Sequence, residues 1–187
     1  MKSLLTRSMA IVLFLFISAV AFSQEIKKDA KVFETKMDKF SSKTGTFSKF
    51  IDTQLPDLKL SYGSAETRIR KLINGTESFY FYQIEKKGQY STSIASIEYS
   101  DLLEVIKALK VLKQDVEKDM AANPDYLENK FTTVDGFQVG YWLAKGKSSW
   151  YITLEKYGSN STLPIKDEMT LETALDGAKA KIEELKK

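Results

Sequence analysis

The stretch Phe79–Met120, FYFYQIEKKGQYSTSIASIEYSDLLEVIKALKVLKQDVEKDM, decides the fold of this chain. It predicts a strand over 79–85, a turn at Lys87-Gly88, a second strand over 90–97 and then a helix. Ser100 or Asp101 is the expected helix cap, because Glu104 follows Asp101 at the spacing of a capping box. Asn123-Pro124 ends the helix. Its expected buried stripe consists of Leu102, Val105, Ile106, Leu109, Leu112 and Val116.

A second copy of this plan runs from Phe137 to Leu185. Strands are expected over 138–143 and 148–156, around Lys145-Gly146, and Thr170 is the expected cap of a last helix. Superimposing Gly88 on Gly146 pairs Phe79 with Phe137, Phe81 with Val139, Ile84 with Trp142 and Ile94 with Ile152. The pattern indicates an internal repeat, with chance convergence of two hairpin–helix units as the alternative.

Further strands complete each unit. Strands are expected over 46–54, ended by Pro56, and over 65–73, followed by the hairpin signal Asn74-Gly75. Strands over 130–134 and 161–165 flank the second hairpin, the latter at a sheet edge because of Pro164. The sequence thus predicts an α+β fold of two antiparallel β-meander–α-helix units. Its expected parts are a signal peptide (1–23), an N-terminal helix or leader (24–45), and the two repeats (46–123 and 124–187).

The first 23 residues have the pattern of an export signal. Lys2 and Arg7 precede the apolar run Met9–Ala21, and Ala21 and Ser23 are small residues of the kind that signal peptidase reads. We expect cleavage after Ser23 and a periplasmic or secreted protein. An uncleaved anchor is the alternative, although the run is short of the roughly 20 residues that a span needs. No membrane span is expected after cleavage.

The composition excludes several classes of catalytic and metal-binding site. The chain has 28 Lys and Arg, 25 Asp and Glu, no Cys and no His. Disulfides, Cys nucleophiles, Ser-His-Asp triads and zinc sites built on Cys or His are therefore excluded. We expect no enzyme, no metal and no cofactor, with a carboxylate metal site or catalytic carboxylate pair formally open. The expected signal carries two of the basic residues, so the mature chain is nearly neutral and has no general attraction to nucleic acid.

The second hairpin carries Lys145-Gly146-Lys147-Ser148-Ser149-Trp150, which resembles the lysine–glycine–lysine motif of the Whirly family. The order of elements over residues 46–185 is similar to that family, known for binding single-stranded DNA in plant organelles. The resemblance implies two sheets packed with helices, DNA along the strands, and assembly into oligomers. The export signal and the neutral charge argue against DNA, so only the fold is carried over. The chain also resembles small secreted proteins of Bacteroidetes.

The two faces of each hairpin follow from its register. Around Lys145-Gly146, the expected core face carries Val139, Tyr141, Leu143, Trp150, Ile152 and Leu154. The opposite face carries Gly140, Trp142, Ser149, Tyr151 and Thr153, with Gly140 leaving room for the Tyr151 ring. In the first hairpin, Phe79, Phe81 and Ile94 are expected inward, and Tyr80, Tyr82, Ile84 and Ser93 outward.

Outward aromatic residues bind glycans, peptides or bases by stacking. We therefore expect an exported binding or interaction module whose ligand is a protein, a peptide or a glycan. The expected ligand-binding residues are Tyr82, Trp142, Tyr151, Lys145 and Lys147. A structural or assembly protein that buries these aromatic faces in an interface is the rival hypothesis, and a homo-oligomer stays open. Arg68, Arg70 and Lys71 can bind an anion, with solvated edge charges as the alternative.

Overall fold

The computed structural model describes residues 34–42, 45–155 and 161–187. The expected export signal and residues 24–33 of the expected N-terminal helix lie outside these ranges. The described elements, in chain order, are α2 (Lys36–Ser41), β1 (Ser48–Lys59), β2 (Ser64–Asn74), β3 (Glu77–Lys87), β4 (Thr92–Glu98), α3 (Tyr99–Ala121), β5 (Tyr126–Thr132), β6 (Gln138–Ala144), β7 (Lys147–Thr153), β8 (Thr162–Pro164) and α4 (Glu168–Leu185).

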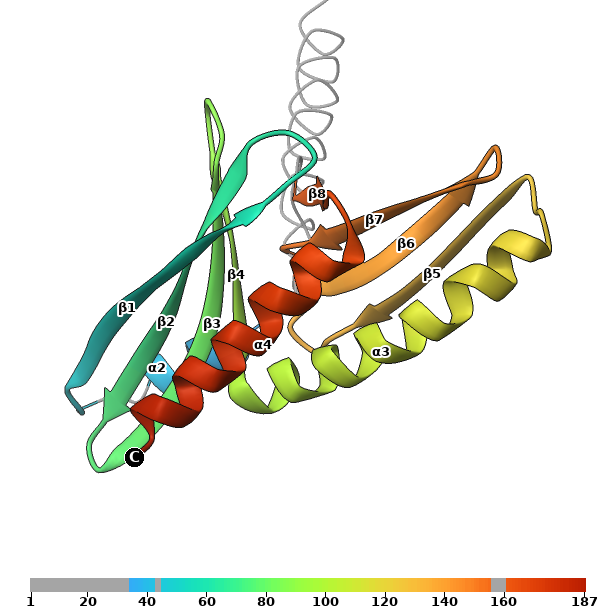
Figure 1. Ribbon diagram of the computed structural model, residues 1–187. Helices are drawn as coiled ribbons and strands as arrows, with labels where there is room; N and C mark the ends of the chain where they lie inside the picture. The colour runs from blue at the N-terminus through green and yellow to red at the C-terminus, as the bar shows by residue number, and fades with distance from the viewer. Residues whose placement is uncertain (1–33, 43–44, 156–160) are drawn as a thin grey trace, which may run out of the picture. The chain divides into compact units, whose positions relative to one another are not determined.

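Strands β1–β4 and β5–β8 form two four-stranded sheets, each antiparallel and each in sequential order (Figure 1). A long helix follows each sheet. The prediction of an α+β fold with two β-meander–helix units is therefore confirmed. None of the helices within the described ranges is long and apolar enough to cross a membrane.

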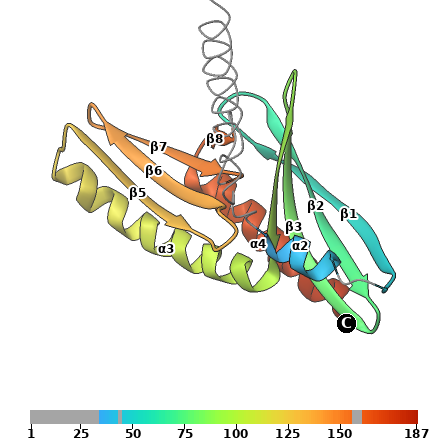
Figure 2. The same cartoon turned by 180° about the vertical axis from the view of Figure 1, so that it is seen from behind.

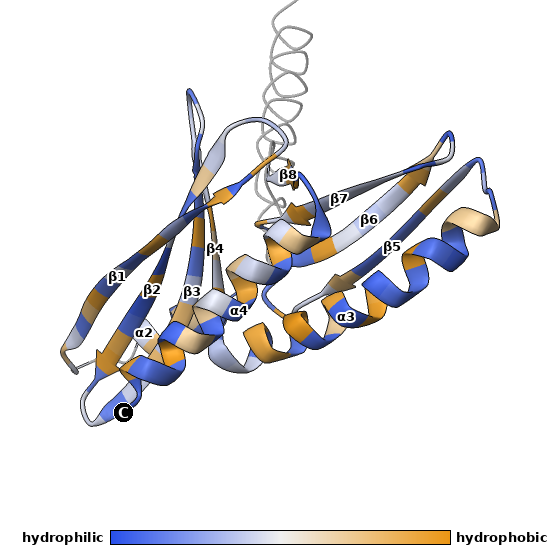
Figure 3. Ribbon diagram, viewed as in Figure 1, coloured by the Kyte–Doolittle hydropathy of each residue, from blue (hydrophilic) through white to orange (hydrophobic). Residues whose placement is uncertain are grey.

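The two long helices are exchanged between the sheets. Helix α3 follows the first sheet but lies along β5, β6 and β7, while its first turns also contact β3 and β4. Helix α4 follows the second sheet but crosses β1 and β2, and it packs against α3. Apolar residues recur along both helices (Figure 3). In α3, four residues of the expected apolar stripe are buried: Leu102, Val105, Leu109 and Leu112. Each sheet thus depends on the helix of the other unit to cover its apolar face.

The face assignment of the second hairpin is confirmed. Val139 pairs with Ile152, Tyr141 with Trp150 and Leu143 with Ser148. All the residues expected on the core face of this hairpin lie in one continuous apolar core with the two helices. The core-facing positions are almost all large and apolar, whereas the opposite face mixes Trp142 and Tyr151 with small and polar residues, and this alternation identifies the core face in the sequence.

The face assignment of the first hairpin is wrong. Tyr80, Tyr82 and Ile84 point into the core beneath the helices, and the Tyr80 hydroxyl donates to the Leu185 carbonyl of α4 at 3.0 Å. Phe79 lies on the opposite face, where the Phe40 ring of α2 stacks on it at 3.9 Å between centroids. Figure 2 shows α2 on the side of the first sheet away from α4. Over residues 79–82 both faces of β3 are aromatic because both are covered, so alternation carries no signal in this part of the strand.

This inversion also corrects the superposition of the two repeats. Phe81 lies outside the core, whereas Val139, its expected counterpart, lies inside. Phe81 is fully buried, but beside Phe40 of α2 and not beneath the long helices. Ile94 is exposed, while Ile152 is buried. Residues on the same face match when Tyr80 and Ile84 are aligned with Val139 and Leu143, one position away from the sequence-based pairing.

Three local predictions are corrected. Strand β1 continues through Pro56 to Lys59, because an edge strand tolerates a residue without an N–H. Helix α3 is capped by Glu98, whose carboxylate accepts from the Ser100 N–H, and not by Ser100 or Asp101. Helix α4 is capped by Asp167, which accepts from the Thr170 N–H at 2.7 Å, and not by Thr170.

Position 140 requires glycine because of the neighbouring strand β5, and not because of the Tyr151 ring. It does lie opposite Tyr151 as expected, but an added Cβ would come within 2.4 Å of the Asn129 carbonyl oxygen and 2.7 Å of the Lys130 Cβ. The neighbouring strand β5 therefore leaves no room for a side chain at this position.

We expect Gly140→Ala to lower the free energy of unfolding by about 1–3 kcal/mol, because the clash is with backbone that cannot move independently. Urea unfolding followed by circular dichroism measures the change. Gly177→Ala is the matched control: an added Cβ there meets no atom within 4 Å, and the change should stabilise α4 by about 0.5–1 kcal/mol. Equal effects of the two substitutions would contradict the assignment.

We expect Asp167→Ala to cost about 1 kcal/mol at neutral pH, the usual value of a lost N-cap. Hydrogen bonds from the Thr170 side chain and from its backbone N–H lower the pKa of Asp167, so the contribution of the cap is present above the unfolded pKa of about 4 and is lost as the pH falls through the lower folded pKa. Parent and variant should therefore converge in stability in acid. Asp176→Ala, which removes an exposed carboxylate from the same helix, is the control, and a difference that persists at low pH would disprove the cap.

Candidate functional site

A groove of about 820 Å³ lies between β1 and α4. One wall is the end of β1, from Leu55 to Lys59. The floor includes Thr67 of β2 and Tyr82 of β3, and the other wall is the side of α4 from Met169 to Glu184. A pocket of this size, mainly apolar with a few polar groups, is typical of small-molecule binding sites.

A β-bulge shapes the β1 wall. Leu55 pairs with Thr67 and Leu58 with Ala65, so Pro56 and Asp57 together lie opposite a single residue of β2. The Thr67 hydroxyl donates to the Pro56 carbonyl at 2.8 Å and holds the bulge in place. The bulge bends the strand locally and ends its regular pairing, as bulges at sheet edges do.

Small residues open the α4 wall. Ala174, Gly177 and Ala180 line the groove at helical spacing, and space is free around the position that a Cβ of Gly177 would take. On the adjacent face of the helix, Leu171, Leu175 and Ile182 are buried in the core. The same helix thus presents a large apolar face to the sheet and a small-residue face to the groove, and the missing side chains give the groove its depth.

Tyr82 lies on the floor and is 1% exposed. Burial raises the pKa of its hydroxyl, which hydrogen-bonds with Thr67. The phenol is therefore neutral at any physiological pH, and it contributes a polar tip at the base of a mainly apolar groove.

Five charged residues line the groove. Asp167 caps α4, and the Lys181 ammonium contacts both carboxylate oxygens of Glu184 at 2.9 Å. Asp57 accepts from the Ser64 hydroxyl at 3.1 Å. Lys59 forms no ion pair or hydrogen bond through its side chain with any residue in the described ranges, so its ammonium is the free cation of the groove.

The structure separates the predicted binding residues. Tyr82 lies in the first sheet on the buried, helix-facing side of β3, and the prediction that it points outward is wrong. The α3 and α4 helices cover that side, so Tyr82 reaches a ligand only through the groove. The other four residues belong to β6, β7 and the turn between them.

Trp142 and Tyr151 meet on the outer face of the second sheet as predicted. Their ring centroids are 4.9 Å apart and the rings are inclined by 31°. Tyr151 is only 2% exposed and donates its hydroxyl to the Glu128 carboxylate, while Trp142 is half-buried. Burial and the Glu128 charge raise the pKa of Tyr151. The pair thus offers one partly accessible ring and no open aromatic platform.

Lys145 and Lys147 flank the turn at Gly146. Lys145 (φ 53°) and Gly146 (φ 71°) both have left-handed backbone, as a tight two-residue hairpin turn requires. Both lysines are exposed at the hairpin tip. The two lysines therefore form a small positively charged patch at the hairpin tip.

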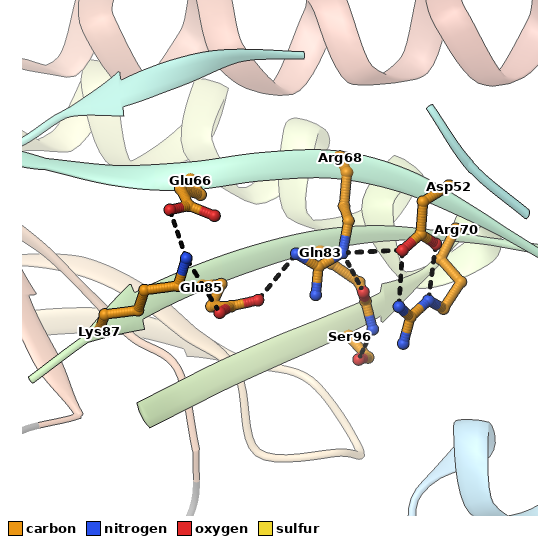
Figure 4. A network of polar contacts seen from close by, with 8 residues as sticks. All are labelled: Asp52, Glu66, Arg68, Arg70, Gln83, Glu85, Lys87 and Ser96. Atoms are coloured by element: carbon orange, nitrogen blue, oxygen red, sulfur yellow. Dashed lines mark hydrogen bonds and ion pairs between the residues drawn. The ribbon is translucent and has the colours of Figure 1, made fainter. Parts of the chain in front are cut away.

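The arginines expected to bind an anion are engaged within the first sheet (Figure 4). Arg70 holds Asp52 through two bonds of 2.7 Å, and Arg68 contacts Glu85 at 2.7 Å. Arg70 lowers the pKa of Asp52. The remaining members are Glu66, Gln83, Lys87 and Ser96. With three cations and three carboxylates, this ladder is neutral and its arginines are not free for an anion.

Sequence reasoning missed most groove residues. Leu55–Lys59 and α4 lie more than 100 positions apart, so no local pattern joins them. Two signals pointed to the site: a proline inside an otherwise strand-like run, which marks an edge or bulge, and a helix rich in Ala and Gly.

Comparison of the chain with protein-family models, with curated proteins and with solved structures finds no match. The resemblance to the Whirly family therefore stays a prediction.

We expect no submicromolar binding of single-stranded DNA at physiological ionic strength. The first sheet presents a neutral ladder, and two lysines at one tip neutralise too few phosphates for tight binding. Titration of a labelled oligonucleotide at two salt concentrations measures this. Tight binding at the higher salt that is lost in a Lys145→Ala, Lys147→Ala double variant would overturn the expectation.

Proposed function

We propose that this chain is an exported, non-enzymatic binding module, and that its groove between β1 and α4 holds a long-chain fatty acid. The observation that carries the proposal is the groove itself: about 820 Å³ of mainly apolar space beside a free lysine. Water in such a space is replaced favourably by hydrocarbon, at about 0.8 kcal/mol for each buried CH₂ group.

The shape of the groove favours a linear ligand. Its α4 wall runs from Met169 to Glu184, which at about 1.5 Å per residue corresponds to roughly 22 Å of helix. Apolar groups, among them Leu55, Leu58 and Ala174, line it. An extended acyl chain fits an elongated apolar groove better than a compact polar ligand does, since it leaves no buried polar group unpaired.

Charge favours a carboxylate head. The Lys59 ammonium has no partner among the described residues, whereas Lys181 is held by Glu184. A ligand carboxylate near Lys59 gains a charge-assisted hydrogen bond without breaking an existing ion pair. The Tyr82 hydroxyl on the floor is neutral, so it does not compete with a ligand carboxylate for the Lys59 ammonium.

We expect Gly177→Phe to weaken binding of a dansyl-labelled fatty acid by roughly tenfold or more, because the ring fills space worth several methylene groups. Titration of the mature protein, followed by dansyl fluorescence, measures the affinity. Gly177→Ala is the matched control and should bind nearly as well as the parent, because a methyl group takes little of the groove.

Two further comparisons identify the site and the head group. Palmitate should displace the probe better than its methyl ester, and Lys59→Gln should remove that preference. Loss of binding in Trp142→Ala, with Gly177→Phe still binding like the parent, would move the site to the second sheet and reject the groove. No saturable binding by the parent would reject the fatty-acid ligand.

A further inference from the structure

The free edge of β1 carries a concentration of exposed apolar residues. β1 is the terminal strand of its sheet, and its segment Ser48–Leu55 pairs with β2 without interruption. Within the described residues, no strand pairs with its other edge. Phe47 is 97% exposed, Phe50 48% and Ile51 40%. These three residues lie within five positions of one another.

The other strand edges are protected. The Ile94 N–H of β4 donates to the Glu155 carboxylate at 2.8 Å, which occupies that edge. β5 exposes Glu128 and Lys130, and β8 is three residues long and ends in Pro164. Charges, prolines and short length are the usual devices against edge-to-edge pairing. The second half of β1 has such a device in its Pro56 bulge, whereas residues 48–54 have no proline or bulge, and of their two charges, Lys49 and Asp52, the second is held by Arg70.

We propose that two copies of this chain associate through β1, which pairs antiparallel with itself around Phe50 to form one continuous eight-stranded sheet. The proposal is independent of the fatty-acid groove, which uses the other half of β1. The segment that would pair, residues 48–54, ends before the bulge and therefore keeps regular strand geometry.

The register follows from two-fold symmetry. An axis perpendicular to a sheet pairs residues that lie on the same face, so Phe50 lies opposite Phe50 of the second copy. Lys49 then lies opposite the second copy's Ile51, and Ser48 opposite its Asp52. No like charges meet, whereas a register centred on Asp52 would bring two carboxylates together. Phe50 already contacts Arg70 of β2, whose guanidinium carbon is 5.7 Å from the ring centroid, so the ring is held on the face of the sheet that carries Arg70.

Sedimentation velocity of the mature protein over a range of concentrations tests the proposal, and we expect a monomer–dimer equilibrium. Phe50→Lys should weaken the dimer by on the order of tenfold or more, because each substitution counts twice and places like charges opposite each other. Phe50→Glu should weaken it similarly. A mixture of the two variants should restore dimers, because the opposite charges then face each other across the axis.

Val111→Lys is the matched control, since it replaces an exposed apolar residue on α3 with the same charged side chain. It should leave the dimer intact, and circular dichroism should show all variants folded. A parent that stays monomeric at every concentration would disprove the proposal. So would a dimer that Phe50→Lys leaves unchanged, or a failure of the mixed variants to associate more tightly than either alone.

Discussion

The exchange of α3 and α4 between the two sheets is the constraint on which the rest of the structure depends. A four-stranded sheet with one apolar face needs a covering layer, and here each unit supplies that layer to the other. The helices are also joined directly, because Lys113 of α3 contacts Glu172 of α4 at 2.6 Å. Neither unit can bury its core alone, so the 34–187 region is expected to unfold as one cooperative body.

The groove is a consequence of this exchange. A single helix crossing a four-stranded sheet cannot cover all of it, and α4 contacts β1 and β2 while leaving space beside the end of β1. Larger residues at Ala174, Gly177 and Ala180 would fill that space. The bulge at Pro56-Asp57 bends the strand there, and the Thr67 bond fixes it. The groove thus depends on two residues that ordinarily destabilise the element that contains them: a glycine in a helix and a proline in a strand.

Local chemistry could be predicted from the sequence, and long-range packing could not. The turns at Asn74-Gly75 and Lys145-Gly146 form where expected, because the left-handed backbone at Gly75 and Gly146 depends only on the residues of the turn itself. The faces of the second hairpin follow from the alternation of apolar residues with mostly small or polar ones. The first hairpin has no alternation to read, because Phe79 and Tyr80 are both covered, one by α2 and the other by α4. Which face lies inward depends on helices far away in the chain.

Aromatic and basic residue types do not mark the groove, because most of them already have partners within their own sheet. Arginines and exposed-looking tyrosines attract attention in a sequence, yet Arg68 and Arg70 are neutralised by carboxylates across the strands, and Tyr151 is held by Glu128. A residue satisfied within its own sheet gains little from a ligand, because binding must first break an existing bond. Lys59 has no such bond among the described residues and lies beside apolar space. A free lysine next to an unfilled groove is therefore a stronger indication of a ligand than a longer row of paired charges.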